Sequence, residues 1–250
     1  MKLILAYTGP NKKFNEEHSV LVKIQIDNSL DLGWGKKDIL LVTDFPYAYN
    51  GIKSLVIGEG FYYDFDKTSI KAPVMMHLFD QGVLKKEELY WCHDFDVYQL
   101  EVVDENELGL NNFDLGLTPY GYKPQWNLGC LFFKESAWDI FKLIHNDVLS
   151  KRKSNNRCEE KALKRLIVHR AIGKKRYKDL NVTYNLTKRC IATNYRQAIK
   201  PLKAVHFHPW DKDAMMPDTA LNMFMYGKNR LKIPLMNERL IKIFHYHGIK

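Results

Sequence analysis

The first 95 residues alternate between short apolar runs and stretches with helical spacing. Residues 2–7 form a continuous apolar run that Thr8-Gly9-Pro10 closes, a pattern typical of a buried strand that leads into a loop. Strands that alternate with helices predict an α/β fold with a mostly parallel central sheet flanked by helices. Further strands are predicted at 38–44, 54–58 and 89–92, and helices at about 15–33 and 73–82.

The second half of the chain continues the pattern with longer helices. The remainder after residue 210 has amphipathic patches near 221–226 and 235–244, and no internal repeat or low-complexity linker divides the chain. We therefore expect one domain over 1–210 and a C-terminal helical extension over 211–250 that packs on it. Strands are predicted here at 113–118, 126–133 and 203–210, and helices at 136–149 and 158–172.

Polar side chains follow several of the predicted strands. Ligands of such sheets bind beyond the carboxyl ends of the strands, so we expect these side chains to line one crevice. A strand directs residues i and i+2 to the same face, so Asp94 and Asp96 can both face one object. Two carboxylates at the end of a buried strand suit a divalent cation that carries a phosphate. The polar strand ends are Tyr7 and Thr8, then Asp44, then His93, Asp94 and Asp96.

The Asp-x-Asp pattern alone is weakly informative, because the chain contains it three times. It recurs at 64–66 and at 211–213, and acidic pairs usually lie in solvated turns. The pair at 211–213 follows Pro-Trp and is typical of a surface turn, whereas the pair at 64–66 stays open. The pair at 94–96 has an apolar, strand-like lead and His93 beside it, so we favour it as the metal site.

Residues 126–129, Trp-Asn-Leu-Gly, begin a predicted strand. The Asn127 amide can bind a sugar hydroxyl, and Gly129 lets a ligand approach the backbone; equally, this segment can be a β-bulge or the entry of a strand. Trp126 and Tyr122 can stack on sugar faces, or they can belong to the core.

Two further pairs carry chemistry. Glu159 and Glu160 lie in the predicted first turn of a helix, where the helix dipole favours carboxylates without any catalysis. The alternative is a general base or a group that binds the acceptor hydroxyl. His206 and His208 are two residues apart on a predicted strand and would share one face. They are either structural or a source of a third ligand for Mn²⁺ beside the two carboxylates.

The charge of the chain favours a polyanionic partner, since the net charge is +9 and the pI is about 9.2. Much of it lies at 151–178, which is either a solvated helix face or a surface for an anionic lipid-linked acceptor or nucleic acid. The four cysteines form no Cys-x-x-Cys pair, so we expect reduced thiols in a cytoplasmic protein. No apolar run approaches the length of a signal peptide or membrane span.

Taken in order, these motifs resemble the GT-A class of nucleotide-sugar glycosyltransferases, a Rossmann-like fold. The resemblance is closest to small enzymes of the glycogenin/galactosyltransferase type and covers about residues 1–210. Two departures leave roles open. The Gly and Lys that usually separate the late histidine from Pro-Trp are missing, so either His206 or His208 can be the ligand. Glu159-Glu160 replaces an acidic residue followed by an amide, so the stereochemistry of transfer stays open.

The resemblance implies a metal-dependent, hexosyltransferase-type enzyme that moves a sugar from a UDP- or GDP-sugar to a glycan, lipid-linked or protein acceptor. The cofactor would be Mn²⁺ or Mg²⁺, held by Asp94, Asp96 and His206 or His208. Tyr122 and Trp126 would contact the acceptor, and Glu159 or Glu160 would act as the base. Contacts with the nucleotide sugar are expected from Ala6, Tyr7, Thr8, Asp44, His93, Asp94, Asn127 and Gly129.

Two rival functions use the same residues. A metal-dependent nuclease or phosphoesterase would combine Asp94 and Asp96 with Glu159 or Glu160, and a non-enzymatic module would dock its basic helices on nucleic acid. The basic residues cluster away from the acidic strand ends, which argues against both, so no nucleic-acid partner is expected. The basic helices would instead be available for peripheral contact with the inner face of a membrane.

Overall fold

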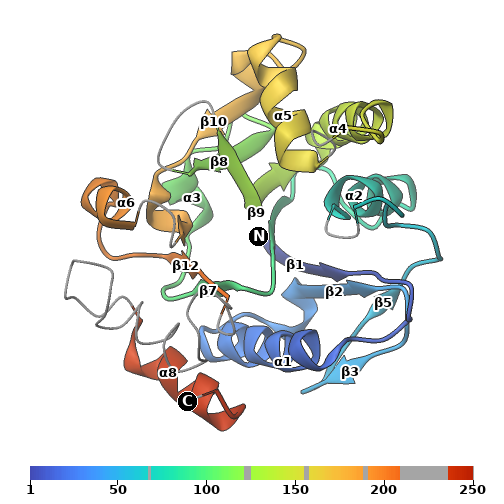
Figure 1. Ribbon diagram of the computed structural model, residues 1–250. Coiled ribbons are helices and arrows are strands. Elements are labelled where there is room, and N and C mark those ends of the chain that lie inside the picture. Colours follow the sequence, from blue (N-terminus) through green and yellow to red (C-terminus); the bar gives the residue numbers. More distant parts are fainter. Residues whose placement is uncertain (67–68, 121–124, 155–157, 188–190, 209–235, 250) are drawn as a thin grey trace.

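The computed structural model describes residues 1–66, 69–120, 125–154, 158–187, 191–208 and 236–249 (Figure 1). Within these ranges the main sheet has seven strands in the order β10-β8-β9-β6-β1-β2-β5. Only β9 runs antiparallel to its neighbours, β6 and β8, which confirms the expected mostly parallel sheet. The strands are β1 (Lys2–Tyr7), β2 (Ile39–Thr43), β5 (Leu55–Val56), β6 (Leu89–His93), β8 (Leu115–Pro119), β9 (Trp126–Lys134) and β10 (Tyr177–Asp179).

Helices cover both faces of this sheet, which explains why its central strands are mostly apolar (Figure 1). Successive side chains of β1 alternate between the faces: Leu3 and Leu5 pack in the cluster that includes α1, and Ile4 packs in the cluster that includes α2. The helices that pack on these faces include α1 (Glu16–Asp31), α2 (Lys71–Asp80), α4 (Trp138–Ser150) and α5 (Glu159–Val168).

A small second sheet stands beside the main one. It comprises β7 (Val97–Gln99), β12 (Ala204–His206) and β11 (Leu186–Thr187), with β12 antiparallel to β7 and parallel to β11. Helix α8 (Glu238–Tyr246) completes this side. Its Leu240 and Phe244 are fully buried in the same cluster as Leu3 and Leu5.

The other elements are short. Most of the extension expected at 211–250, including the patch at 221–226, lies outside the described residues, and α8 is the helix seen there. No helix in the ranges given above has both the length and the apolarity needed to cross a bilayer. The short elements are β3 (Ala48–Tyr49), β4 (Ile52–Lys53), α3 (Glu105–Leu108), α6 (Ile191–Gln197) and the 3₁₀ turns Lys36–Asp38, Glu135–Ala137, Lys174–Arg176 and Val182–Tyr184.

Candidate metal centre and ligand cavity

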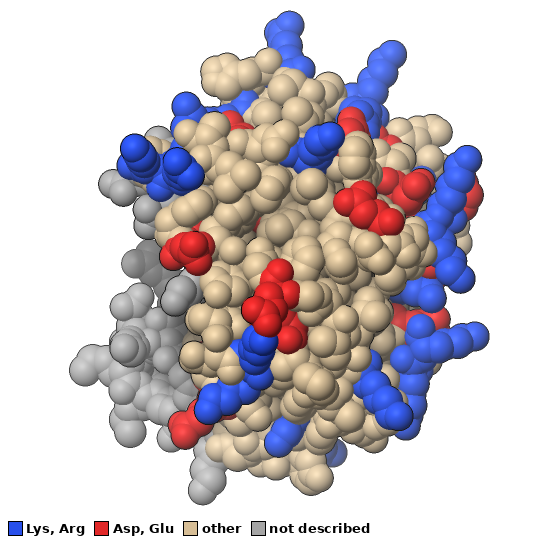
Figure 2. All heavy atoms as spheres, turned by 90° about the vertical axis from the view of Figure 1, so that its right-hand side faces the viewer, with Lys and Arg blue, Asp and Glu red and all other residues tan. Residues whose placement is uncertain are grey.

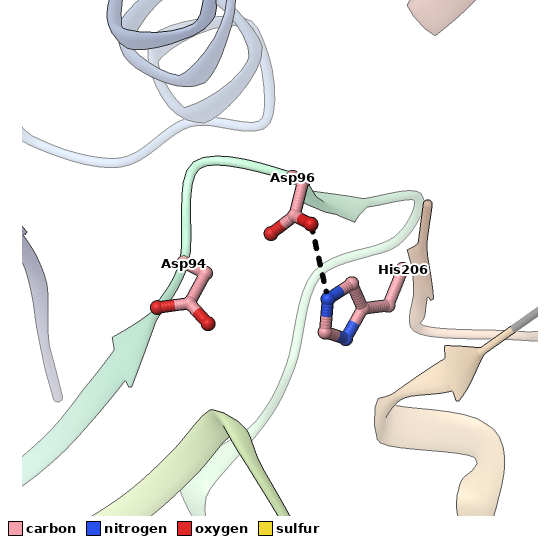
Figure 3. Close-up of side chains that lie close together, drawn as sticks. All are labelled: Asp94, Asp96 and His206. Atoms are coloured by element: carbon pink, nitrogen blue, oxygen red, sulfur yellow. Dashed lines mark ion pairs between the residues drawn. The ribbon is translucent and has the colours of Figure 1, made fainter. Parts of the chain in front are cut away.

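Three side chains with metal-binding chemistry meet beyond the carboxyl end of β6. One ligand atom from each of Asp94, Asp96 and His206 lies within 4.8 Å of the other two (Figure 3). His206 Nε2 lies 3.3 Å from Asp96 Oδ2. The two carboxylates come from the link between β6 and β7, and the imidazole comes from the end of β12. The cluster therefore joins the main sheet to the small sheet.

The two carboxylates converge as expected, but the strand geometry predicted for them is wrong. Strand β6 ends at His93, and Asp94 begins a tight turn in which the Val97 N–H donates to the Asp94 carbonyl at 3.2 Å. The Phe207 N–H donates to the Asp96 carbonyl at 3.0 Å, and His206 stands opposite Val97 in the β7–β12 ladder. This ladder is what brings residue 206 to the aspartates.

The charges of the cluster stabilise one another. Burial raises the pKa of Asp96, but the neighbouring His206 lowers it more, so the net pKa lies below the ordinary value. Burial likewise lowers the pKa of His206, and the Asp96 carboxylate more than reverses this. The Asp94 carboxylate forms an ion pair with the buried Lys71 ammonium. Burial lowers the pKa of Lys71, yet Asp94 beside it brings about a net rise.

Lys71 was missed by the sequence reasoning. It is the first residue of α2, where the helix dipole disfavours a cation, so a buried lysine here needs an anionic partner. The signal in the sequence was a lysine two residues before the predicted helix start at Pro73, but nothing local identified Asp94 as its partner.

Glu159 binds the backbone of the first turn of α2, where Lys71 lies. Its Oε1 accepts from the Ala72 N–H at 2.7 Å and its Oε2 accepts from the Lys71 N–H at 3.3 Å. The N-cap residue of α2 makes no side-chain hydrogen bond to the helix. Glu159, a residue of α5, accepts the backbone N–H groups that such a cap would bind. Burial raises the pKa of Glu159 to about 7.

The segment with Asn127 and Gly129 forms a bulge in β9, one of the alternatives that its sequence allowed. The β8–β9 register jumps between Leu117 and Thr118, so residues 128–130 have no partner on β8. The backbone groups of Gly129 find hydrogen-bond partners outside β8. Asn127 Oδ1 accepts from the Gly129 N–H at 2.6 Å, and the Gly129 carbonyl accepts from the Asp94 N–H at 2.8 Å.

Glu160 holds the same bulge from α5. Its Oε1 accepts from the Leu128 N–H at 3.0 Å, and its carboxylate also accepts from the Tyr120 hydroxyl at 3.0 Å. Burial raises the pKa of Glu160. The two glutamates expected to be catalytic thus both accept from backbone N–H groups: Glu159 from Lys71 and Ala72, and Glu160 from Leu128 beside Gly129.

The lack of a side chain at Gly129 leaves space for the side chains of the cluster. A Cβ at this position would lie 2.5 Å from His206 Cε1, 2.6 Å from Asn127 Oδ1 and 3.0 Å from Asp94 Oδ2. Carbon atoms normally approach to about 3.5–4.0 Å, so any larger residue would push into the site. Glycine at residue 129 is therefore a spatial requirement of the cluster.

A cavity of about 610 Å³ opens beside the cluster. Its aromatic wall is formed around Tyr7, whose ring centroid lies 4.8 Å from those of Phe14 and His18. Phe95, between the two aspartates, stacks at 6.2 Å from Tyr7. Of the residues expected to bind the nucleotide sugar, Ala6, Tyr7, Thr8 and Asp94 line this cavity, together with Asp96 and His208.

Asp44 and His93, also expected to bind the nucleotide sugar, do not line this cavity. Asp44 Oδ2 accepts from the Gly9 N–H at 3.1 Å, and Asp44 Oδ1 is buried with no hydrogen-bond partner among the described residues. The His93 ring packs edge-on against Trp91, and its Nδ1 lies 2.8 Å from the Asp94 carbonyl. Burial lowers the pKa of His93 to about 4, so this imidazole is neutral.

The remaining expected site residues lie elsewhere. His208 lines the cavity, and its Nε2 contacts a carboxylate oxygen of Glu17 of α1, outside the cluster of three. Trp126 is only 3% exposed, and its Nε1 donates to Asp179 Oδ1 at 2.8 Å, which favours a packing role. Tyr122 lies outside the described residues.

The basic run at 151–178 is partly neutralised. Arg165 pairs with Asp147, and Arg176 with Asp114 and Asp139. On the face that Figure 2 shows, Lys and Arg are interspersed with Asp and Glu. This mixture is typical of a solvated surface.

The residues of the cluster fit a divalent cation. Carboxylates suit Mg²⁺ and Mn²⁺, and an imidazole beside them suits Mn²⁺. The absence of a Cβ at Gly129 keeps the space between Asp94 and His206 open. We conclude that Asp94, Asp96 and His206 can hold such an ion.

Comparison with known proteins identifies the fold. No protein-family model and no curated protein sequence matches the chain. Among solved structures, an active-site mutant of LgtC aligns with a TM-score of 0.61 at 13% identity, over 98% of this chain and 96% of LgtC. A glycosyltransferase involved in glycosylation of the major capsid of PBCV-1 aligns at 0.53 and 12%, over 82% and 93%. GlyE of Streptococcus pneumoniae TIGR4 aligns at 0.56 and 12%, over 100% of this chain and 65% of GlyE. The chain therefore has the GT-A fold of nucleotide-sugar glycosyltransferases.

Proposed function

We propose that this protein is a metal-dependent glycosyltransferase that uses a nucleoside-diphosphate sugar as donor and a glycan, lipid-linked or protein acceptor. The observation that carries the proposal is the cluster of Asp94, Asp96 and His206, whose two aspartates also line an aromatic-walled cavity. In α/β sheets ligands bind at this edge, beyond the carboxyl ends of the strands. The related fold of LgtC, whose structure is a complex with donor and acceptor sugar analogs, supports the same substrate class.

The nucleoside would occupy the cavity. Tyr7 and Phe14 offer ring faces for a base, since base–aromatic stacking contributes about 1–3 kcal/mol per base. Asp44 lies behind this wall, where its Oδ2 accepts from the Gly9 N–H; its Oδ1 has no partner among the described residues, and an N–H group of a bound base would satisfy it. Thr8 and the backbone at Ala6 complete this wall.

The diphosphate would lie against the cluster, on the side where Lys71 contacts Asp94. Asp94, Asp96 and His206 would hold Mn²⁺ or Mg²⁺, which supplies Lewis-acid stabilisation of the leaving nucleoside diphosphate when bound. Lys71 adds a fixed ammonium beside Asp94, and the fixed charge needs no reorganisation during the reaction. The donor sugar would then lie against Asn127 and Gly129.

We assign positioning roles to the two glutamates, in place of the catalytic base expected from the sequence. Glu159 holds the first turn of α2 and so fixes Lys71. Glu160 holds the β9 bulge and so fixes Asn127 and Gly129.

The test is donor turnover. Purified protein is incubated with a panel of UDP- and GDP-sugars, and release of the nucleoside diphosphate is measured with Mn²⁺ and with EDTA. We expect turnover of at least one donor that depends on the metal and falls by about 100-fold or more in Asp96→Asn. Asp64→Asn, in the other described Asp-x-Asp pair, is the matched control and should keep full turnover. Equal turnover in wild type and Asp96→Asn, or none with any donor, would refute the proposal.

A further inference from the structure

The candidate metal cluster draws its ligands from two sheets, so something must fix one sheet relative to the other. Asp94 follows β6 of the main sheet, whereas His206 ends β12 of the small sheet. A metal site tolerates errors of only about 0.2 Å in its ligand distances. The side chain that orients His206 therefore matters as much as the ligand itself.

Asn185 occupies that place. It lies directly before β11, the parallel neighbour of β12, and it is fully buried. Its Oδ1 lies 3.2 Å from His206 Nδ1, on the side of the ring away from Asp96. Figure 3 shows the other ring nitrogen, Nε2, turned towards Asp96.

Thr118 of β8 fixes the amide in turn. The Asn185 Nδ2 donates to the Thr118 hydroxyl oxygen at 3.1 Å, and Thr118 is also fully buried. With Nδ2 bound there, the amide presents its oxygen to the imidazole. An amide oxygen can only accept, so the proton of the neutral ring is held on Nδ1, and Nε2 keeps its lone pair for a metal.

We propose that Asn185 is the positioning residue of the metal centre, which fixes the tautomer and the orientation of His206, and that Thr118 fixes Asn185. The chain Thr118–Asn185–His206 crosses from the main sheet to the small sheet and ends at the aspartates. It is the amide counterpart of the carboxylate that commonly orients a metal-binding histidine. This inference rests on the proposed metal-dependent function.

The experiment measures metal binding itself. MnCl₂ is titrated into purified protein, with and without excess UDP or GDP, and free Mn²⁺ is followed by electron paramagnetic resonance. Asn185→Leu is nearly isosteric but has no acceptor, and we expect it to weaken Mn²⁺ binding by about 10–100-fold. Asn185→Asp keeps an acceptor at the same atom and should restore binding to near the wild-type level.

Two further variants separate positioning from a general structural role. Thr118→Val removes the acceptor that holds the amide and should weaken Mn²⁺ binding, whereas Thr118→Ser should keep it; this pair carries the test if Asn185→Leu does not fold. Asn28→Leu is the matched control. Asn28 is another fully buried amide with two bonds, to the Gln99 carbonyl and from Arg239, so its loss should leave Mn²⁺ binding by the folded protein unchanged.

The outcomes distinguish this inference from the proposed function. If the wild type binds Mn²⁺ and both Asn185→Leu and Thr118→Val bind it equally well, the inference is overturned but the proposed function stands. Wild-type protein that binds no Mn²⁺ with either nucleotide would overturn the metal centre and the inference together. If Asn185→Leu binds Mn²⁺ weakly and Asn185→Asp does so too, the inference is also overturned. The lost acceptor would then not be the cause of the lower Mn²⁺ affinity.

Discussion

The sharpest consequence of the cluster concerns Gly129. In Gly129→Ala the new Cβ would stand 2.5 Å from His206 Cε1 and 3.0 Å from Asp94 Oδ2. Since carbon atoms pack at about 3.5–4.0 Å, the imidazole would have to withdraw by about 1 Å. That displacement exceeds the tolerance of a metal site about five times over. We expect Mn²⁺ affinity and donor turnover to fall by about 100-fold.

A matched variant separates this effect from overpacking in general. In Gly116→Ala, on β8, the new Cβ would stand 2.8 Å from Leu180 Cδ1 and 3.0 Å from Leu110 Cδ1, in an apolar environment. Both variants should lose about 1–3 kcal/mol of unfolding free energy, measured by urea denaturation. Only Gly129→Ala should lose Mn²⁺ binding, measured by titration calorimetry. If the two variants bound Mn²⁺ equally well, the reasoning would be refuted.

Three further predictions concern Glu159, Lys71 and Phe14. The pKa of Glu159 is about 7 in the folded protein and near 4.5 when unfolded, so stability should fall as pH rises between these values; urea unfolding should show a flatter profile in Glu159→Gln. Lys71→Met removes a cation beside Asp94, so calorimetry should show tighter Mn²⁺ binding while donor turnover falls at least about tenfold. Phe14→Ala should weaken binding of nucleoside diphosphates by about 1–3 kcal/mol but leave pyrophosphate binding unchanged; equal losses for both would contradict a stacking role.

The main sheet could be predicted because its strands are buried on both faces. Such strands give continuous apolar runs, as in Lys2–Tyr7 and Leu89–His93, and these runs stand out in a single sequence. Strand β7 is also buried, but it was missed because it is short and its pairing is not local. Val97–Gln99 has three residues, and it is a strand only because β12, more than a hundred residues away, pairs with it.

Some residues of the candidate site could be predicted from the sequence and others could not. Asp94 and Asp96 could be found because they follow a recognisable strand, although a turn and not a strand makes them converge. Lys71 and Asn185 could not be found, because each gains its role from a partner distant in sequence. Trp126 allowed both a stacking and a core role, and only the fold, which buries it against Tyr177, distinguishes them.

The most direct test of the central proposal is a thermal-shift panel. Nucleoside diphosphates and nucleotide sugars are each added with Mn²⁺ and with EDTA, since a ligand that binds the native state raises the melting temperature by mass action. We predict that a UDP- or GDP-type ligand raises the melting temperature of wild type only with Mn²⁺, and that Asp96→Asn loses this shift. A shift that is unchanged in EDTA, or that Asp96→Asn retains, would contradict a metal-dependent donor site at Asp94, Asp96 and His206.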